Sequence, residues 1–334
     1  MLKGDRQLKK RRVEKLRKIR SWTVLLLIAL AAACSAGGSQ TADLDFSIQA
    51  SDPAYSPGQG PVVLVDAGHH NFHTAQGRYK PFADLLRSDG YQVRSLRSRF
   101  EASALQAGRI LVISNALSER NAQFEDWGLP TYPAFEKDEV EAVKSWVERG
   151  GALLLIADHM PMPGAAADLA AAFGVRFSNG YAIHEKRESP RPPLKFRRAG
   201  DSQPSDGLLR HHPILQGRNS SEGVNVVATF TGQAFQSDHG DPILVFGPSI
   251  ISLQPQEPAQ FTDQTPRVEV EGWYQGLAMR FGEGRAAFFG EAAMFTAQLS
   301  GGDRPMGMNA PQAPENAQFL LNLMHWLSGL LEEE

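Results

Sequence analysis

Polar side chains that can transfer a proton or bind a ligand gather at three places in this sequence. Three short apolar runs cover residues 61–66, 152–157 and 285–290, and the polar side chains lie at the end of each run or directly after it. Imidazole and carboxylate groups are the usual acids, bases and metal ligands of proteins, so the set suits acid–base chemistry, metal binding or recognition of a polar ligand. The candidate side chains are Asp66, His69, His70, Asn71, His73, Arg78, Asp158, His159 and Glu291.

Two interpretations of these residues stay open at this point. In the first, some of His69, His70, His73 and His159, together with a carboxylate, hold a divalent metal that lowers the pKa of a bound water for hydrolysis. In the second, the same side chains hydrogen-bond one another and the loop backbones, with Asp66 orienting the first loop, and form a polar pocket. No HExxH or comparable spacing selects the metal. We therefore commit to no cofactor and keep a divalent metal as the alternative.

The apolar runs alternate with segments of helical periodicity, which is typical of a parallel sheet covered on both faces. We predict an α/β fold, an open flavodoxin-like parallel sheet with helices on both faces, followed by a C-terminal hairpin and helix. The expected strands are residues 61–66, 91–96, 109–114 and 152–157, the expected helices are 81–89, 135–149, 165–173 and 314–331, and the hairpin covers 276–290. A further helix is expected to begin at Glu291.

Ligands of open parallel sheets bind in the crevice at the carboxyl ends of the strands. The sequence therefore predicts one ligand-binding crevice there, with Asp158, His159 and Glu291 as the candidates for any catalytic role. The predicted ligand-binding residues are His70, Asn71, His73, Arg78, Asp158, His159 and Glu291.

Several stretches of the chain resemble the class I glutamine amidotransferase-like superfamily, and within it an uncharacterised secreted or membrane-attached bacterial branch. Some members of that branch accompany transporters. The resemblance implies the flavodoxin-like sheet already expected from the alternation of strands and helices. It is carried by residues 62–73, 77–87, 150–159, 212–217 and 281–291.

The chain departs from this superfamily at the position that does the chemistry. Amidotransferases place a nucleophilic cysteine on a sharp turn after a strand, whereas the elbow-like position after the fourth expected strand carries Asp158 and His159. The single cysteine, Cys34, belongs to the N-terminal leader. Glutaminase chemistry through a thioester is therefore excluded, because no thiol stands at the elbow to form one.

The N-terminus has the pattern of an export signal. Residues 1–20 carry a net charge of +8, and the apolar run over residues 22–33 falls short of the roughly 20 residues that span a bilayer. Three alanines and then Cys34 resemble a bacterial lipobox, so we expect a signal peptide over residues 1–33, a lipid on Cys34 and a flexible tether over 34–60. A plain signal peptide or an uncleaved short anchor is the alternative.

The rest of the chain forms a single expected domain. We place it at residues 61–331, with an exposed insertion over the Arg- and Pro-rich residues 185–207. Beyond residue 20 the formal charge is −11, which repels nucleic acid and excludes it as a partner.

Together these features predict an exported domain that is lipid-anchored to the cell envelope, on the periplasmic side and at the outer membrane if there is one. Its partners are then the membrane, through the N-terminal lipid, and a small molecule or an envelope protein bound in the crevice. The alternative is a metal-dependent hydrolase acting on an envelope carbohydrate, peptide or ester. A structural envelope protein without a ligand is the third class.

Overall fold

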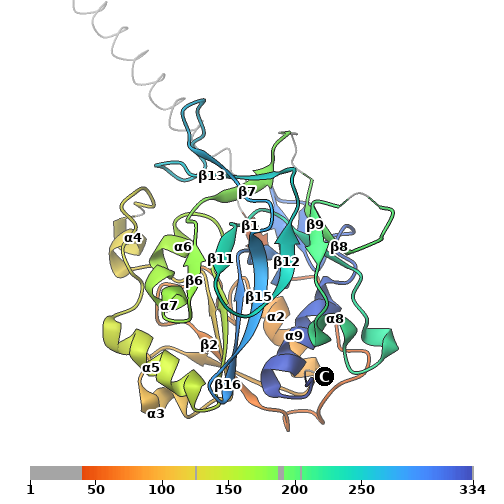
Figure 1. The fold of residues 1–334 in the computed structure, drawn as a ribbon. Helices are drawn as coiled ribbons and strands as arrows, with labels where there is room; N and C mark the ends of the chain where they lie inside the picture. The colour runs from red at the N-terminus through yellow and green to blue at the C-terminus, as the bar shows by residue number, and fades with distance from the viewer. Residues whose placement is uncertain (1–39, 125, 187–191, 204, 333–334) are drawn as a thin grey trace, which may run out of the picture.

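A central β-sheet runs through the described part of the chain, which in the computed structural model comprises residues 40–124, 126–186, 192–203 and 205–332 (Figure 1). Five neighbouring strands of this twelve-stranded sheet run parallel. These strands are, in spatial order, β3 (Gln92–Leu96), β2 (Val62–Asp66), β4 (Ile110–Ser114), β5 (Ala152–Ile156) and β16 (Gly284–Phe289). Numbered along the chain this is the 2-1-3-4-5 order of flavodoxin-like folds, so the predicted fold class is confirmed.

Further strands extend the sheet beyond β16. The strand β15 (Tyr274–Phe281) forms the predicted hairpin with β16, and β12 (Asp241–Phe246), β9 (Gly207–Leu209), β8 (Leu194–Arg198) and β10 (Val226–Thr229) follow in that spatial order. These strands pair antiparallel, except β8 and β9, which run parallel to each other. The short strand β11 (Phe235–Ser237) pairs with β15 and with β6 (Val175–Phe177).

Two smaller sheets accompany the central one. The first consists of β1 (Gln40–Ala42), β17 (Ala297–Ser300) and β18 (Arg304–Gly307), and the second of β14 (Arg267–Glu269), β13 (Ile250–Leu253) and β7 (Tyr181–His184). The helix expected from Glu291 onward is not formed. A single 3-10 turn, η2 (Ala293–Phe295), follows Glu291, and the chain then enters β17, because backbone pairing with β1 and β18 continues from Ala297.

Helices cover both faces of the parallel strands, as the alternation along the sequence predicts (Figure 1). On one face lie α2 (Lys80–Ser88) and α9 (Asn316–Ser328), and on the other lie α3 (Ala102–Leu105), α5 (Lys137–Glu148), α6 (Met162–Ala165) and α7 (Ala167–Ala171). The remaining helical segments are α4 (Glu119–Phe124), α8 (Pro213–Gln216) and η1 (Ser220–Glu222).

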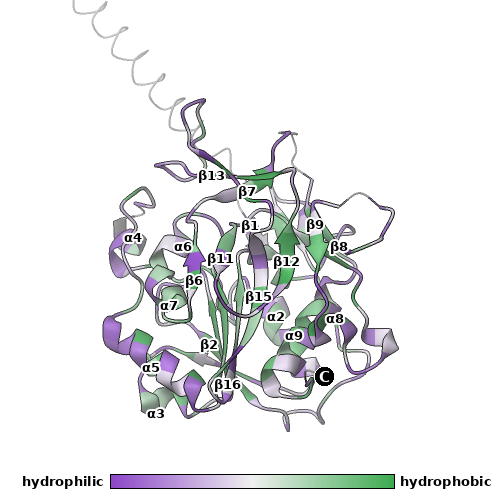
Figure 2. Cartoon of the chain, viewed as in Figure 1, coloured by the Kyte–Doolittle hydropathy of each residue, from purple (hydrophilic) through white to green (hydrophobic). Residues whose placement is uncertain are grey.

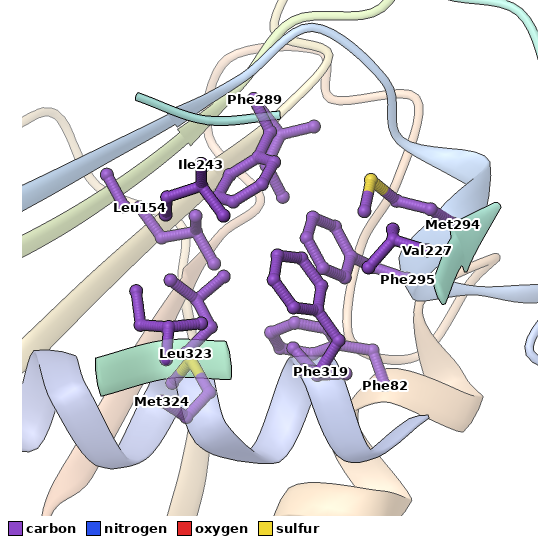
Figure 3. Packing of buried hydrophobic residues seen from close by; sticks show 14 of the residues in the cluster. Phe82, Leu154, Val227, Ile243, Phe289, Met294, Phe295, Phe319, Leu323 and Met324 are labelled. Atoms are coloured by element: carbon purple, nitrogen blue, oxygen red, sulfur yellow. The ribbon is translucent and has the colours of Figure 1, made fainter. Parts of the chain in front are cut away.

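Strand residues pack alternately onto these two helical layers, because successive side chains of a strand point to opposite faces. In β5, Leu154 joins the cluster under α9, whereas Leu153 and Leu155 join the cluster under α5. Figure 3 shows Leu154 and Phe319 within the first cluster. Each such side chain, when fully buried, contributes about 1.5–3 kcal/mol to folding.

The two long covering helices differ in how much of their surface is apolar. Eleven residues of α9 are buried, so the helix is enclosed on nearly all sides. By contrast, α5 buries Val143, Trp146 and Val147 on one stripe, and it mixes hydrophilic and hydrophobic residues in Figure 2. A capping box between Glu136 and Glu139 starts α5, and both carboxylates accept backbone N–H groups there.

Residues 40–60 are held against the domain, although the sequence predicts them as part of a flexible tether. The strand β1 pairs with β17, and Ala54 N–H donates to Asp89 Oδ1 at 2.7 Å. The Tyr55 ring packs edge-on against Tyr91, with 5.1 Å between the centroids. Phe46, Ile48 and Tyr55 of this segment pack against the main core cluster, so residues 40–60 lie on the domain.

The Arg- and Pro-rich insertion is likewise only partly exposed. Its residues 194–198 form β8, which lies between β10 and β9 in the central sheet. The side chains of Leu194 and Phe196 are buried in the core, because a strand of alternating pattern hides every second residue.

The predicted signal peptide, residues 1–33, and the predicted lipidation site Cys34 lie outside the described residues. Among the helices that the structure does describe, none has the length and apolar character needed to cross a membrane.

Candidate functional site

A cavity of about 250 Å³ opens at the carboxyl ends of the parallel strands, where the sequence predicts the crevice. Loops that follow β2, β4, β5 and β16 form one part of its wall, and the small sheet of β1, β17 and β18 forms another. Its lining residues are Gln40, Phe72, His73, Arg78, Asn115, Trp127, Asp158, His159, Met162, Phe230, Thr231, Glu291, Ala293, Gln298 and Met306. Five of the seven predicted ligand-binding residues therefore meet in one cavity.

His73, in the loop after β2, is a buried and neutral imidazole. Burial, and then the nearby charge of Arg78, lowers the pKa of His73 to about 3. Its Nδ1 lies 3.3 Å from Nδ2 of Asn115. The Oδ1 of Asn115 accepts the backbone N–H of Asp158 at 2.8 Å, which fixes the orientation of the amide.

This geometry determines the tautomer of His73. Since Nδ2 of Asn115 can only donate, Nδ1 of His73 accepts and the ring proton sits on Nε2. That Nε2 is buried and has no hydrogen-bond partner within the described residues. The Oε1 of Gln298, another lining residue, is also buried and has no hydrogen-bond partner among the described residues. Two lining residues thus each contain a buried polar atom, one donor and one acceptor, that no described residue pairs.

Asn115 also marks a sharp turn at the end of β4. Its φ of +50° lies in the left-handed region, which Asn tolerates better than other residues with a Cβ. A catalytic elbow presents its nucleophile on such a turn. The sequence places the elbow-like position after β5, at Asp158 and His159, whereas this left-handed residue follows β4. Its amide is not a nucleophile, so the turn orients neighbouring groups instead.

Asp158 and His159 follow β5 and present an acceptor nitrogen to the cavity wall. The backbone N–H of His159 donates to Asp158 Oδ1 at 2.8 Å. The Nδ1 of His159 donates to the carbonyl of Met160 at 2.9 Å, which leaves Nε2 as an acceptor in the neutral ring. The ring stacks on Tyr181 at 4.4 Å with an interplanar angle of 15°, so its orientation is fixed.

Glu291 is the buried acid of the site. Its carboxylate accepts the backbone N–H groups of Ala293 at 3.0 Å and of Met294 at 2.7 Å. Burial, and then the negative charge of Asp158, raises the pKa of Glu291 well above its ordinary value despite these donors. A buried carboxyl group whose pKa is raised in this way is typical of acid–base sites.

Arg78 provides the positive charge of the cavity. Its Nε donates to the carbonyl of Gln40 at 3.2 Å and its Nη1 to that of Phe72 at 3.4 Å. The guanidinium carbon lies 3.8 Å from the centroid of the Phe72 ring. Burial lowers the pKa of Arg78 from its ordinary value, yet an arginine keeps its charge at neutral pH.

The other histidines of the first loop do not join the cavity. His69 is buried between two carboxylates, with Nδ1 at 3.0 Å from Asp66 and Nε2 at 3.0 Å from Glu139. His70 is exposed with φ of +47°. Asn71 donates to Asp66 Oδ2 at 2.9 Å, so Asp66 orients the loop as the sequence predicts.

The four histidines proposed as metal ligands are therefore not assembled into one set. Over the residues that the structure describes, no group of three or more His, Cys, Asp or Glu side chains is arranged to hold a metal ion. His69 is occupied by its two carboxylates, and only His73 and His159 line the cavity.

Sequence reasoning did not identify several lining residues. Asn115 ends an apolar run in the same way as Asp158, so the polar pair Ser114–Asn115 was a usable signal. Gln40, Gln298 and Met306 come from the short strands of the small sheet, and nothing in their sequence places that sheet over the crevice.

Known proteins resemble this chain in fold and not in sequence. No protein-family model and no curated protein sequence matches it. Among solved structures, the N-terminal domain of mmIFT52 is 14% identical, with 80% of this chain and 97% of that chain covered and a TM-score of 0.55. A ThuA-like protein from Bacteroides uniformis ATCC 8492 is 11% identical, with 83% and 95% covered and a TM-score of 0.43. A ThuA-like protein from Parabacteroides merdae ATCC 43184 is also 11% identical, with 83% and 93% covered and a TM-score of 0.40.

Identities this low concern the fold alone. The order of the parallel strands and the likeness to the mmIFT52 domain agree on one architecture. The chain has a flavodoxin-like fold, and its described residues contain no cysteine.

Proposed function

We propose that this protein binds a small polyhydroxylated ligand in the cavity at the carboxyl ends of the parallel strands. The observation that carries the proposal is the pair of unpartnered polar atoms in the cavity lining, the donor Nε2 of His73 and the acceptor Oε1 of Gln298. Buried polar groups without partners are costly, so a site that keeps them is suited to a ligand that supplies the partners. A hydroxyl group does so, because it donates and accepts at once.

The rest of the lining supports the same ligand class. Half-buried rings of Phe72, Trp127 and Phe230 offer apolar faces to the C–H groups of a sugar or polyol. Beyond their internal hydrogen bonds, the Asn115 amide has a second N–H to donate, and the Thr231 hydroxyl, which donates to the Phe230 carbonyl, can still accept. At about 250 Å³ the cavity lies just below the roughly 300–1,000 Å³ of drug-sized pockets, which fits a ligand of one or two rings.

The test is a fluorescence titration of the full-length chain, in detergent, with a panel of hexoses and disaccharides. We expect at least one saccharide to change the tryptophan emission, and Trp127→Phe to abolish that change. Trp273→Phe, at a half-buried tryptophan outside the cavity lining, is the matched control and is expected to keep it. Saccharide titrations that leave the emission unchanged, or a signal that survives Trp127→Phe, would contradict the proposal.

We also propose that the domain is exported and lipid-anchored through Cys34, with a signal peptide over residues 1–33. The support is the basic leader, the short apolar run and the placement of the single cysteine directly after three alanines. Growth with labelled palmitate is expected to label the wild-type protein and not Cys34→Ala. Equal labelling of both proteins, or of neither, would overturn the anchor.

A second candidate is hydrolysis of an envelope carbohydrate or ester by acid–base catalysis in the same cavity. What favours it is the combination of an acceptor nitrogen on His159 with a Glu291 whose pKa burial and Asp158 raise. Turnover of nitrophenyl glycosides or esters that both His159→Ala and Glu291→Gln abolish, in folded protein, would support an enzyme. Binding without turnover would favour the ligand-binding proposal. A metal-dependent variant is tested by the metal content of protein purified without chelators.

A further inference from the structure

Arg78 lines the cavity without a carboxylate to neutralise it. Its two observed hydrogen bonds go to the backbone carbonyls of Gln40 and Phe72. Among the described residues no Asp or Glu forms an ion pair with it, although Asp158 and Glu291 line the same cavity. The guanidinium is thus fixed in position by neutral groups while its charge stays unmatched.

The local structure prepares this guanidinium for a ligand. The Phe72 ring supports one face of it at 3.8 Å, and the carbonyl acceptors hold Nε and one proton of Nη1. A guanidinium has five N–H donors, so the Nη2 side of the fork remains available. A planar fork with a fixed orientation matches a carboxylate or phosphate oxygen pair, and little side-chain entropy is lost when it binds.

The positive charge also acts on the rest of the site. Together with burial it keeps His73 neutral, so the neighbouring imidazole adds no second cation. The acidic residues Asp158 and Glu291 lie on loops after β5 and β16, whereas Arg78 lies on the loop that precedes α2. A bound molecule can therefore place an anionic group on the Arg78 loop and hydroxyl groups toward the acidic loops.

We infer that the ligand carries an anionic group, a carboxylate or a phosphate monoester on its polyhydroxylated body, and that Arg78 binds this group. The inference rests on the proposed function, since it names the chemical class of the ligand in that same cavity. It also explains why a partly buried arginine is kept without an acidic partner, which is otherwise unfavourable.

The test compares three probes of matched shape: glucose, glucuronate and glucose 6-phosphate. Each is titrated calorimetrically into the full-length chain, in detergent, for wild type, Arg78→Gln, Arg78→Lys and the control Arg94→Gln at an exposed arginine. One or both anions are expected to bind roughly ten- to hundredfold more tightly than glucose, since charge-assisted hydrogen bonds are the strong ones. Whichever anion is preferred identifies the group.

The variants separate charge from fork geometry. Arg78→Gln is expected to reduce the affinity for the anion to that for glucose, Arg78→Lys to retain part of the preference, and Arg94→Gln to change nothing. Raising the salt concentration should weaken the anions and not glucose. Unfolding midpoints of the variants show whether each remains folded.

Two results would overturn the inference in distinguishable ways. Glucose binding as tightly as both anions, or an anion preference that survives in folded Arg78→Gln, refutes the role of Arg78 and leaves the proposed function standing. Failure of all three probes to bind the folded wild type refutes the inference together with the proposed function.

Discussion

The buried histidine bridge under the first loop gives the sharpest test of how the structure holds its site. His69 lies between Asp66 at the end of β2 and Glu139 on α5, with 3.0 Å to each carboxylate. Its ring packs on Phe100 and Phe135, at centroid distances of 4.4 and 5.0 Å. We predict that His69→Asn destabilises the protein strongly, whereas His70→Asn, next to it on the surface, does not.

The magnitude follows from burial. Removing one partner from a buried ion pair costs about 3–5 kcal/mol, because the remaining charge stays buried without compensation. The exposed fractions of His69, Asp66 and Glu139 are 7%, 0% and 3%, so this buried estimate applies. Asparagine at position 69 can keep one hydrogen bond, so we expect about 3 kcal/mol. At His70, Asn suits the positive φ and fills no core, so the change should stay within about 0.5 kcal/mol.

The pH dependence has a definite sign. Burial alone would lower the pKa of His69, but the hydrogen bonds and charges of Asp66 and Glu139 outweigh it and raise the pKa above 6.5. The contribution of His69 is therefore complete below pH 6.5 and is lost as the pH rises through its raised folded pKa. Although burial opposes it, the N–H groups of Glu136 and Phe100, together with His69, lower the pKa of Glu139 below 4.5. The contribution of Glu139 is thus present above pH 4.5 and is lost as the pH falls through its lowered pKa.

The groups that surround this bridge are Asp66, Glu139 and Arg99, whose Nε lies 3.6 Å from Glu139. The assay is guanidinium unfolding followed by far-ultraviolet circular dichroism, at pH 5.5 and pH 9. We expect the gap between wild type and His69→Asn to be largest at pH 5.5 and smaller at pH 9. A gap that grows toward pH 9, or an equal loss in His69→Asn and His70→Asn, would refute the reasoning.

Three further perturbations test the core, the hairpin and the cavity. Phe319→Ala is expected to cost about 3–5 kcal/mol in unfolding experiments, because the ring is fully buried on α9, whereas Leu44→Ala, at a side chain 78% exposed, should change little. Gly284→Ala should lower the melting temperature or prevent folding, since a Cβ there would lie 2.1 Å from the carbonyl oxygen of Val147; an unchanged melting temperature would contradict this packing. Asn115→Ala should weaken saccharide binding by about tenfold, because it removes the amide that orients His73 and the Asp158 loop, and unaltered affinity in a titration would show that this amide is dispensable.

The fold was largely readable from the sequence because its parallel strands are buried on both faces. Runs such as Val-Leu-Val before Asp66 and Ala-Leu-Leu-Leu-Ile before Asp158 are buried at every position, and that pattern belongs to a sheet between two helical layers. Buried parallel strands also located Asp158 and Glu291. Residues that follow such a strand lie at the carboxyl edge of the sheet, where the cavity is.

Sequence reasoning could not supply the direction in which each side chain points, nor the pairing of strands that lie far apart in the chain. His69 and His73 lie four residues apart in one loop, yet one packs on α5 and the other lines the cavity. Only the folded loop decides which way each ring points. The strands β1 and β17 are separated by more than 250 residues and are three and four residues long, so their pairing leaves no local signal.

The central claim is that the cavity between the parallel strands and the small sheet holds a polyhydroxylated ligand. Its most direct test is a crystal structure of the full-length protein grown with the saccharide that binds best in the titrations. The account predicts the molecule inside the cavity, with a hydroxyl group within hydrogen-bond distance of His73 Nε2 and Gln298 Oε1. A saccharide bound elsewhere, with both of these atoms still unpartnered, would contradict it.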